Sequence, residues 1–254
     1  MRRRFGRLPI AMIMLSLVAA ACAVETSAPS TSTSSSTTSV VETTTTIPPT
    51  STTTSLPTTT TELRGDPVEG GPQRGAVLAV VGVAHDDVLN LRAAPGADQP
   101  ILAGIPPTYE EIVALGETRS LPAWWVKVVY EDTVGWVNLS FLAFIGATSD
   151  VTAAILDQLG GSLEAATMTE LGAEVAAAAA SDDPPSDIVV VVDETVGDLG
   201  EITYDVIGLG DDSVAGVRLH IFGEPTTGGF SLRTVEMTAL CQPVRGVDDD
   251  GLCV

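Results

Sequence analysis

Few residues of this chain have the types and spacings that catalysis or metal binding requires. The two histidines, His85 and His220, have no cysteine or acid at metal-ligand spacing around them, so neither is expected to act as a ligand or general base. The sequence contains no G-x-S-x-G elbow, no phosphate-binding P-loop and no H-E-x-x-H pair. We therefore predict no catalytic residue, no cofactor and no metal centre.

Two runs of acidic residues have side chains of the kind that bind a hard cation. They are Asp211-Asp212 and Asp248-Asp249-Asp250, and carboxylates in a turn suit calcium. Neither run has the spacing of a calcium loop. We interpret both runs as solvated turns.

The three cysteines fit an oxidising compartment. Cys241 and Cys253 are predicted to form a disulfide, which would contribute about 3 kcal/mol in the chain-entropy model. The alternative is two free thiols near the C-terminus, which is unusual in an exported protein.

All three tryptophans lie close together, at Trp124, Trp125 and Trp136. Adjacent residues on a strand point to opposite faces, so one ring of the pair Trp124 and Trp125 should face solvent. Exposed aromatic side chains are common contact points for peptides and sugars. The alternative is that Trp125 and Trp136 fill a core while Trp124 is an incidental surface residue.

The tryptophans must be positioned by a small all-β domain, which we predict over residues 71–146. Short apolar runs separated by Gly, Pro and Asp are typical of a small barrel. The runs cover residues 77–83, 88–91, 101–105, 111–115, 125–130 and 134–137. We interpret Asn90, Arg92 and Gly96 as residues that hold the fold, and Gly135 as a point of close approach between two strands.

Residues 149–254 are predicted to form an α+β domain. Apolar residues at helical spacing indicate two helices, at about 151–159 and 163–178. Four β-like segments follow, at residues 188–192, 201–207, 214–222 and 229–240, separated by turn residues. The expected layout is two helices and then a four-stranded antiparallel sheet, and we assign this domain to no family.

Three segments of the all-β region carry a family resemblance. Residues 86–96 read DDVLNLRAAPG, residues 124–130 read WWVKVVY, and residues 134–138 read VGWVN. In this order they resemble the bacterial SH3-like family, whose aliphatic stretch also has a counterpart at residues 101–106. The resemblance implies a domain that binds cell-wall peptides or targets a hydrolase to the wall. The binding candidates that it implies are Trp124, Tyr130, Trp136 and Asn138.

The N-terminus predicts export. Basic residues, an apolar stretch and three alanines make residues 1–21 a signal peptide, too short to be a spanning helix. Cys22 then resembles the lipidated cysteine of bacterial lipoproteins, although Ala19 stands where that family usually has Leu, and ordinary signal cleavage is the alternative. Residues 22–70, rich in Ser, Thr and Pro, are predicted to be a disordered linker.

The chain is strongly acidic, with a formal net charge of −21. Residues 1–21 contain four Arg and no acid, so the charge of the mature chain would be −25. Such a charge repels phosphates and anionic headgroups, so we expect no nucleic acid partner and membrane contact only through the N-terminal lipid anchor. The expected location is the cell surface or envelope, anchored to the plasma membrane.

Together these features favour a non-catalytic envelope protein whose SH3-like domain binds cell-wall peptide, peptidoglycan or an envelope protein. An alternative is an accessory protein or enzyme of cell-wall metabolism that acts through residues 149–254. A third interpretation is a structural spacer. An exposed pocket with paired carboxylates in the second domain would favour the enzyme.

Overall fold

The structure, a computed structural model, describes residues 63–254. The predicted signal peptide (1–21), the lipidation site Cys22 and the linker up to residue 62 lie outside the described residues. The last residues of the range predicted as linker contain a short strand, β1 (Asp66–Pro67), which pairs with β5 (Ile112–Leu121). The linker prediction rested on composition, and two residues can join a sheet through their backbone groups alone.

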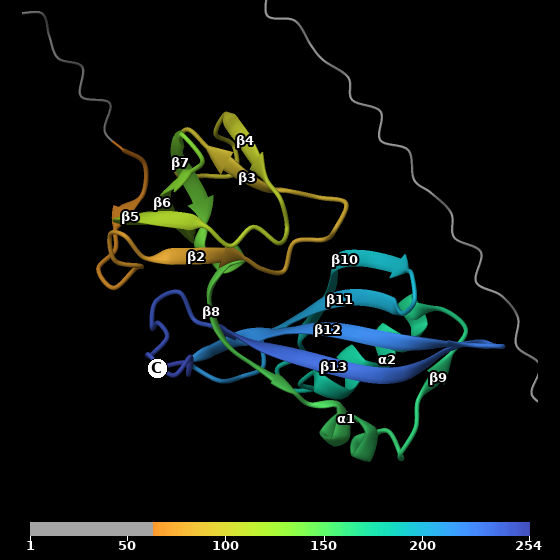
Figure 1. Cartoon of the computed structure of the whole chain (residues 1–254). Helices are drawn as coiled ribbons and strands as arrows, with labels where there is room; N and C mark the ends of the chain where they lie inside the picture. The colour runs from red at the N-terminus through yellow and green to blue at the C-terminus, as the bar shows by residue number, and fades with distance from the viewer. Residues whose placement is uncertain (1–62) are drawn as a thin grey trace, which may run out of the picture. The chain divides into compact units, whose positions relative to one another are not determined.

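The first half of the described chain consists of short antiparallel strands, as the sequence predicts. The elements after β1 are β2 (Val77–Val80), β3 (Leu89–Arg92), β4 (Ile101–Ile105), β5, β6 (Ala123–Tyr130), β7 (Thr133–Asn138), the 3-10 helix η1 (Leu139–Phe141) and β8 (Leu142–Asp150). The strands pair in the order β8-β2-β5-β6-β7-β3-β4 (Figure 1). They surround one apolar core, in which Leu91, Ile105 and Ile112 are fully buried.

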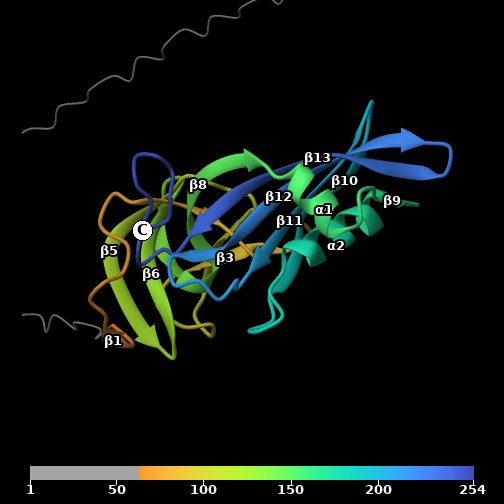
Figure 2. The same ribbon diagram turned by 90° about the horizontal axis from the view of Figure 1, so that it is seen from below.

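The second half contains the two predicted helices and the four predicted antiparallel strands, and two further strands pair with the last of these four. Its elements are α1 (Thr152–Gln158), β9 (Glu164–Ala165), α2 (Met168–Ala179), β10 (Asp187–Val196), β11 (Gly200–Ile207), β12 (Val214–Thr226) and β13 (Gly229–Cys241). Both helices lie on one face of the sheet, the face seen in Figure 2. Leu171 and Val175 of α2 pack there against Ile202, Leu219 and Ile221.

The second helix begins at Met168, later than predicted. The residues assigned to its first turn form β9, which pairs with β13 instead. The Thr167 side chain then accepts a hydrogen bond from the Glu170 amide and caps the helix. Apolar spacing alone does not reveal this cap, because Leu163 packs into the same core from outside the helix.

Strand β8 connects the two halves. Its first residues, Leu142 and Ala143, pair with β2, and residues 144–150 pair with β13. A small apolar cluster of Val81, Ala143 and Leu240 lies beside this strand. All of residues 63–254 belong to one compact unit, and β8 spans the boundary that the sequence places between residues 146 and 149.

The predicted disulfide between Cys241 and Cys253 is present. It closes the C-terminal loop beside β8, where the Ala147 amide donates a hydrogen bond to the Gly251 carbonyl (2.7 Å). Within residues 63–254, no helix has the length and hydropathy needed to cross a membrane. The same residues contain no group of three or more His, Cys, Asp or Glu side chains arranged for a metal ion.

Candidate ligand-binding groove

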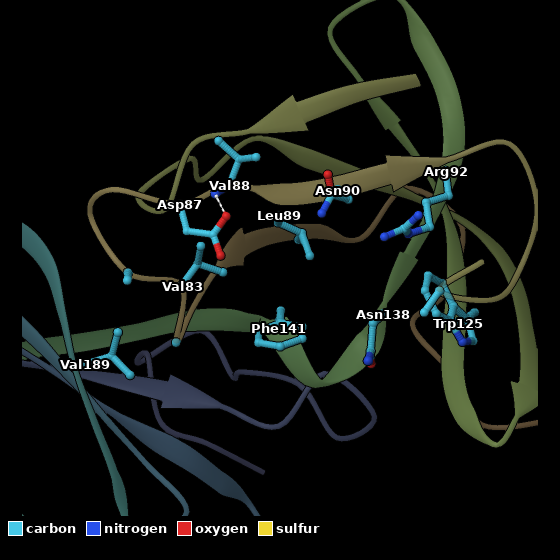
Figure 3. Close-up of a pocket in the computed structure, with 13 residues that line it drawn as sticks. Val83, Asp87, Val88, Leu89, Asn90, Arg92, Trp125, Asn138, Phe141 and Val189 are labelled. Atoms are coloured by element: carbon cyan, nitrogen blue, oxygen red, sulfur yellow. Dashed lines mark hydrogen bonds between the residues drawn. The ribbon is translucent and has the colours of Figure 1, made fainter. Parts of the chain in front are cut away.

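A groove of about 460 Å³ opens on the first half of the chain (Figure 3). One wall is the loop between β2 and β3 together with β3 itself, and the opposite wall is η1. The end of β7 and Trp125 of β6 contribute to one end of the groove, and Val189 of β10 contributes at the other. The groove is therefore lined mainly by loops and strand ends that converge from distant parts of the sequence.

The apolar surface of the groove comes from both walls. Val88 of the loop is 42% exposed and Phe141 of η1 is 37% exposed, so both side chains can contact a ligand. Val83, Leu89 and Trp125 also line the groove but are nearly buried, so packing holds their side chains in place. An apolar lining with a few polar groups is typical of a ligand site.

Polar groups lie at both ends of the groove. Asp87 lies at the Val189 end, where one carboxylate oxygen accepts the Val88 amide proton (2.7 Å). Arg92 lies at the Trp125 end, and its Nη1 donates to the carbonyl oxygen of Gln99 (2.8 Å). This bond uses one of the five guanidinium N–H donors. The groove thus has a carboxylate at one end and a guanidinium at the other.

Two amides supplement these charges. The Asn138 side-chain oxygen accepts hydrogen bonds from the Ser140 amide (3.0 Å) and hydroxyl (2.9 Å), which caps η1. Within residues 63–254, neither the Asn138 side-chain nitrogen nor the Asn90 side chain makes a hydrogen bond to protein. These amide groups are therefore available to a ligand.

The groove contains one of the four binding candidates from the sequence, Asn138. Trp124 is 39% exposed and Trp125 is buried, so the expected alternation of the pair holds. The Trp124 ring lies outside the groove of Figure 3. It lines a second, neutral groove on the other side of η1, together with Asn138, Pro243 and Val244.

Trp136 lies outside both grooves and is 2% exposed. It is not part of the main apolar cluster, because it lies on the opposite face of β7 from Val137, which belongs to that cluster. Its ring is covered by Lys127, whose Nζ lies 5.8 Å from the ring centroid.

Lys127 also donates a hydrogen bond to Glu117, and Arg119 donates a second one. Burial opposes ionisation of Glu117, but these two hydrogen bonds outweigh it and lower the pKa of that carboxyl.

Tyr130 also lies outside both grooves. It packs against the core and meets Tyr109 edge to face, with ring centroids 4.9 Å apart. Desolvation and the nearby Glu131 carboxylate raise the pKa of the Tyr130 hydroxyl. Its position indicates a packing role.

Most residues that line the groove fall within a segment of the chain that matches a family model. Residues 87–143 match the family model of the bacterial SH3 domain. The chain contains a bacterial SH3 domain. Domains of this family are of a cell-wall-binding type and typically occur in envelope or extracellular proteins. No curated protein and no solved structure matches the chain.

Several groove residues were not among the sequence candidates. Asp87, Val88 and Arg92 lie in or beside the SH3 motif, but an exposed loop valine gives no pattern that distinguishes it from other surface residues. Phe141 was not predicted as a binding residue because it lies beyond the last motif of the family resemblance, which ends at residue 138. Val189 had no sequence signal at all, since it reaches the SH3 domain from β10.

Proposed function

We propose that this protein is a non-catalytic binding protein of the cell envelope whose SH3 domain binds a cell-wall peptide in the groove of Figure 3. Export and anchoring through Cys22 belong to the same proposal, and they are supported by the order of basic, apolar and small residues before that cysteine. Cell-wall binding is also the role typical of the family.

The observation that carries the proposal is the distribution of charge along the groove. Asp87 at one end can bind an amine, and the N–H groups of Arg92 that make no hydrogen bond within residues 63–254 can bind a carboxylate at the other end. Between them lie exposed apolar side chains and unpaired amides that suit a short peptide backbone. Cell-wall peptides carry both amines and carboxylates, so they offer groups for both ends.

Cosedimentation of the full chain with purified peptidoglycan sacculi over a range of salt tests the proposal. We expect binding that survives moderate salt, because the apolar part of the contact is not screened. Val88→Ala should weaken binding several-fold, since it removes exposed apolar surface inside the groove. Val134→Ala is the matched control, because Val134 is 49% exposed but lies outside the groove, and it should bind like wild type.

Two results would contradict the proposal. Wild-type protein that stays in the supernatant at every salt concentration would exclude sacculi as the ligand. Equal loss of binding by Val88→Ala and Val134→Ala would remove the groove as the contact site.

A further inference from the structure

A buried ion pair lies on the second half of the chain, beside the SH3 domain. Asp205 of β11 is fully buried, and Arg218 of β12 is 9% exposed. The two strands place them as direct cross-strand partners. Arg218 Nε donates to Asp205 Oδ1 (2.8 Å) and Arg218 Nη2 donates to Oδ2 (3.1 Å). This is the bidentate geometry that makes such pairs strong and directional.

Both partners also bind the backbone of the SH3 domain. Arg218 Nη2 donates to the Val80 carbonyl (2.8 Å), and the Gly82 amide donates to Asp205 Oδ2 (2.9 Å). Val80 ends β2, and Gly82 is the second residue of the loop that forms one wall of the groove. The φ of Gly82 is +64°, a conformation that favours glycine, so the loop leaves β2 through a turn held at this ion pair.

The same loop has a third attachment to the second half. The His85 amide donates to the Val190 carbonyl of β10 (2.9 Å). The next residue towards the start of that strand, Val189, lines the groove itself. The loop between β2 and β3 is thus held at its start and near its middle by β10, β11 and β12.

We infer that Asp205 and Arg218 are positioning residues for the SH3 groove, and that the second half of the chain sets the affinity of this groove by fixing its loop wall. The inference rests on the proposed function. A buried ion pair by itself is poor evidence of stabilisation, because desolvation offsets much of the attraction. Its bonds to Val80 and Gly82 give it a role that an apolar pair could not perform. Holding the loop in place before binding lowers the entropy lost when a ligand binds.

Substitutions of His85 can separate the positioning of the loop from the overall stability of the fold. The hydrogen bond from the Asp87 amide to the Ala84 carbonyl makes residues 84–87 a β-turn with His85 at its second position, where proline is favoured. His85→Pro therefore keeps the turn and removes only the donor to Val190. His85→Ala keeps that donor and serves as the matched control, because the His85 side chain is exposed and lies outside the groove.

The test compares both variants with wild type by sedimentation with sacculi, thermal unfolding and amide hydrogen exchange. For His85→Pro we expect a melting temperature lowered by no more than about 2–4 °C, faster exchange of the loop amides and a dissociation constant raised about fivefold, the equivalent of one hydrogen bond. His85→Ala should match wild type in all three measurements. A second variant pair, Arg218→Lys and Glu110→Gln, tests the ion pair itself. Lysine has no planar guanidinium to bind Asp205 and Val80 at the same time, whereas Glu110→Gln removes only the charge of the outer partner of Arg218 (3.3 Å).

The outcomes are distinguishable. If wild type does not bind sacculi, the proposed function fails, and the affinity part of this inference fails with it. If wild type binds and His85→Pro and Arg218→Lys bind equally well with unchanged loop exchange, the inference alone is overturned.

Discussion

Replacement of Arg218 by methionine should be far more damaging than replacement of its partner Asp205 by asparagine. Asp205 is fully buried, and its one ion-pair partner within residues 63–254 is Arg218. Arg218→Met therefore leaves a buried charge without compensation, which costs about 3–5 kcal/mol. Asp205→Asn leaves Arg218 at a more exposed position with a second carboxylate, Glu110, and the amide oxygen can still accept from the Gly82 amide. Its cost should be about 1–3 kcal/mol.

These free energies correspond to readily measured shifts. For a unit of this size, each kcal/mol lowers the melting temperature by about 2–4 °C. Arg218→Met should therefore melt roughly 6–20 °C below wild type, and Asp205→Asn roughly 2–12 °C below. Thermal unfolding followed by circular dichroism and urea titration of the same samples give two independent values. An equal loss of stability in the two variants, or a larger loss in Asp205→Asn, would refute the view that the buried charge of Asp205 needs Arg218 more than Arg218 needs Asp205.

Three further predictions concern the SH3 domain. Trp136→Ala should lower the free energy of unfolding by about 3–5 kcal/mol, whereas Trp124→Ala should lower it by much less because its ring is 39% exposed, and urea titration of both compares them directly. Gly135→Ala should cost about 1–3 kcal/mol, because a Cβ there would lie 2.6 Å from a buried leucine side chain and 2.9 Å from a backbone carbonyl, and a melting temperature equal to wild type would contradict this close contact. Because the pKa of Glu117 is lowered, its ion pairs stabilise the fold above the unfolded pKa, and this stabilisation is lost as the pH falls through the folded pKa. Lys127→Gln should therefore make the free energy of unfolding depend less steeply on pH in the acid range. Curves of unfolding free energy against pH with the same acid slope for variant and wild type would exclude this contribution.

The fold was largely predictable because its signals are local. Alternating apolar residues and turn residues define the strands of the SH3 domain, and helical spacing defines α1. The start of α2 was misplaced because its cap at Thr167 and the pairing of residues 164–165 depend on a strand far along the chain.

The site was less predictable, because aromatic residues in a motif serve packing as often as binding. Trp136 and Tyr130 belong to recognisable segments, yet one lies beneath Lys127 and the other against the core. The exposed groove residues Val88 and Phe141 have no distinguishing pattern, since exposure depends on the packing of neighbouring loops. Asn138 was among the candidates because it is the polar residue after the GWV motif, and the structure adds that it caps η1.

The course of β8 limits how this protein can be divided. A fragment that ends at residue 146, where sequence motifs place the end of the SH3 domain, would cut the strand between its partner β2 and most of its pairing with β13. The remaining half would keep residues 148–150 on β13, but Leu240 and Cys241 would lose their partners in β8, and the backbone N–H and C=O groups at that end of the strand would be exposed and favour aggregation. Separate production of either half therefore risks insolubility for a reason unrelated to its core. Any exchange of this SH3 domain between proteins would need to carry the second sheet, or a substitute for β8, with it.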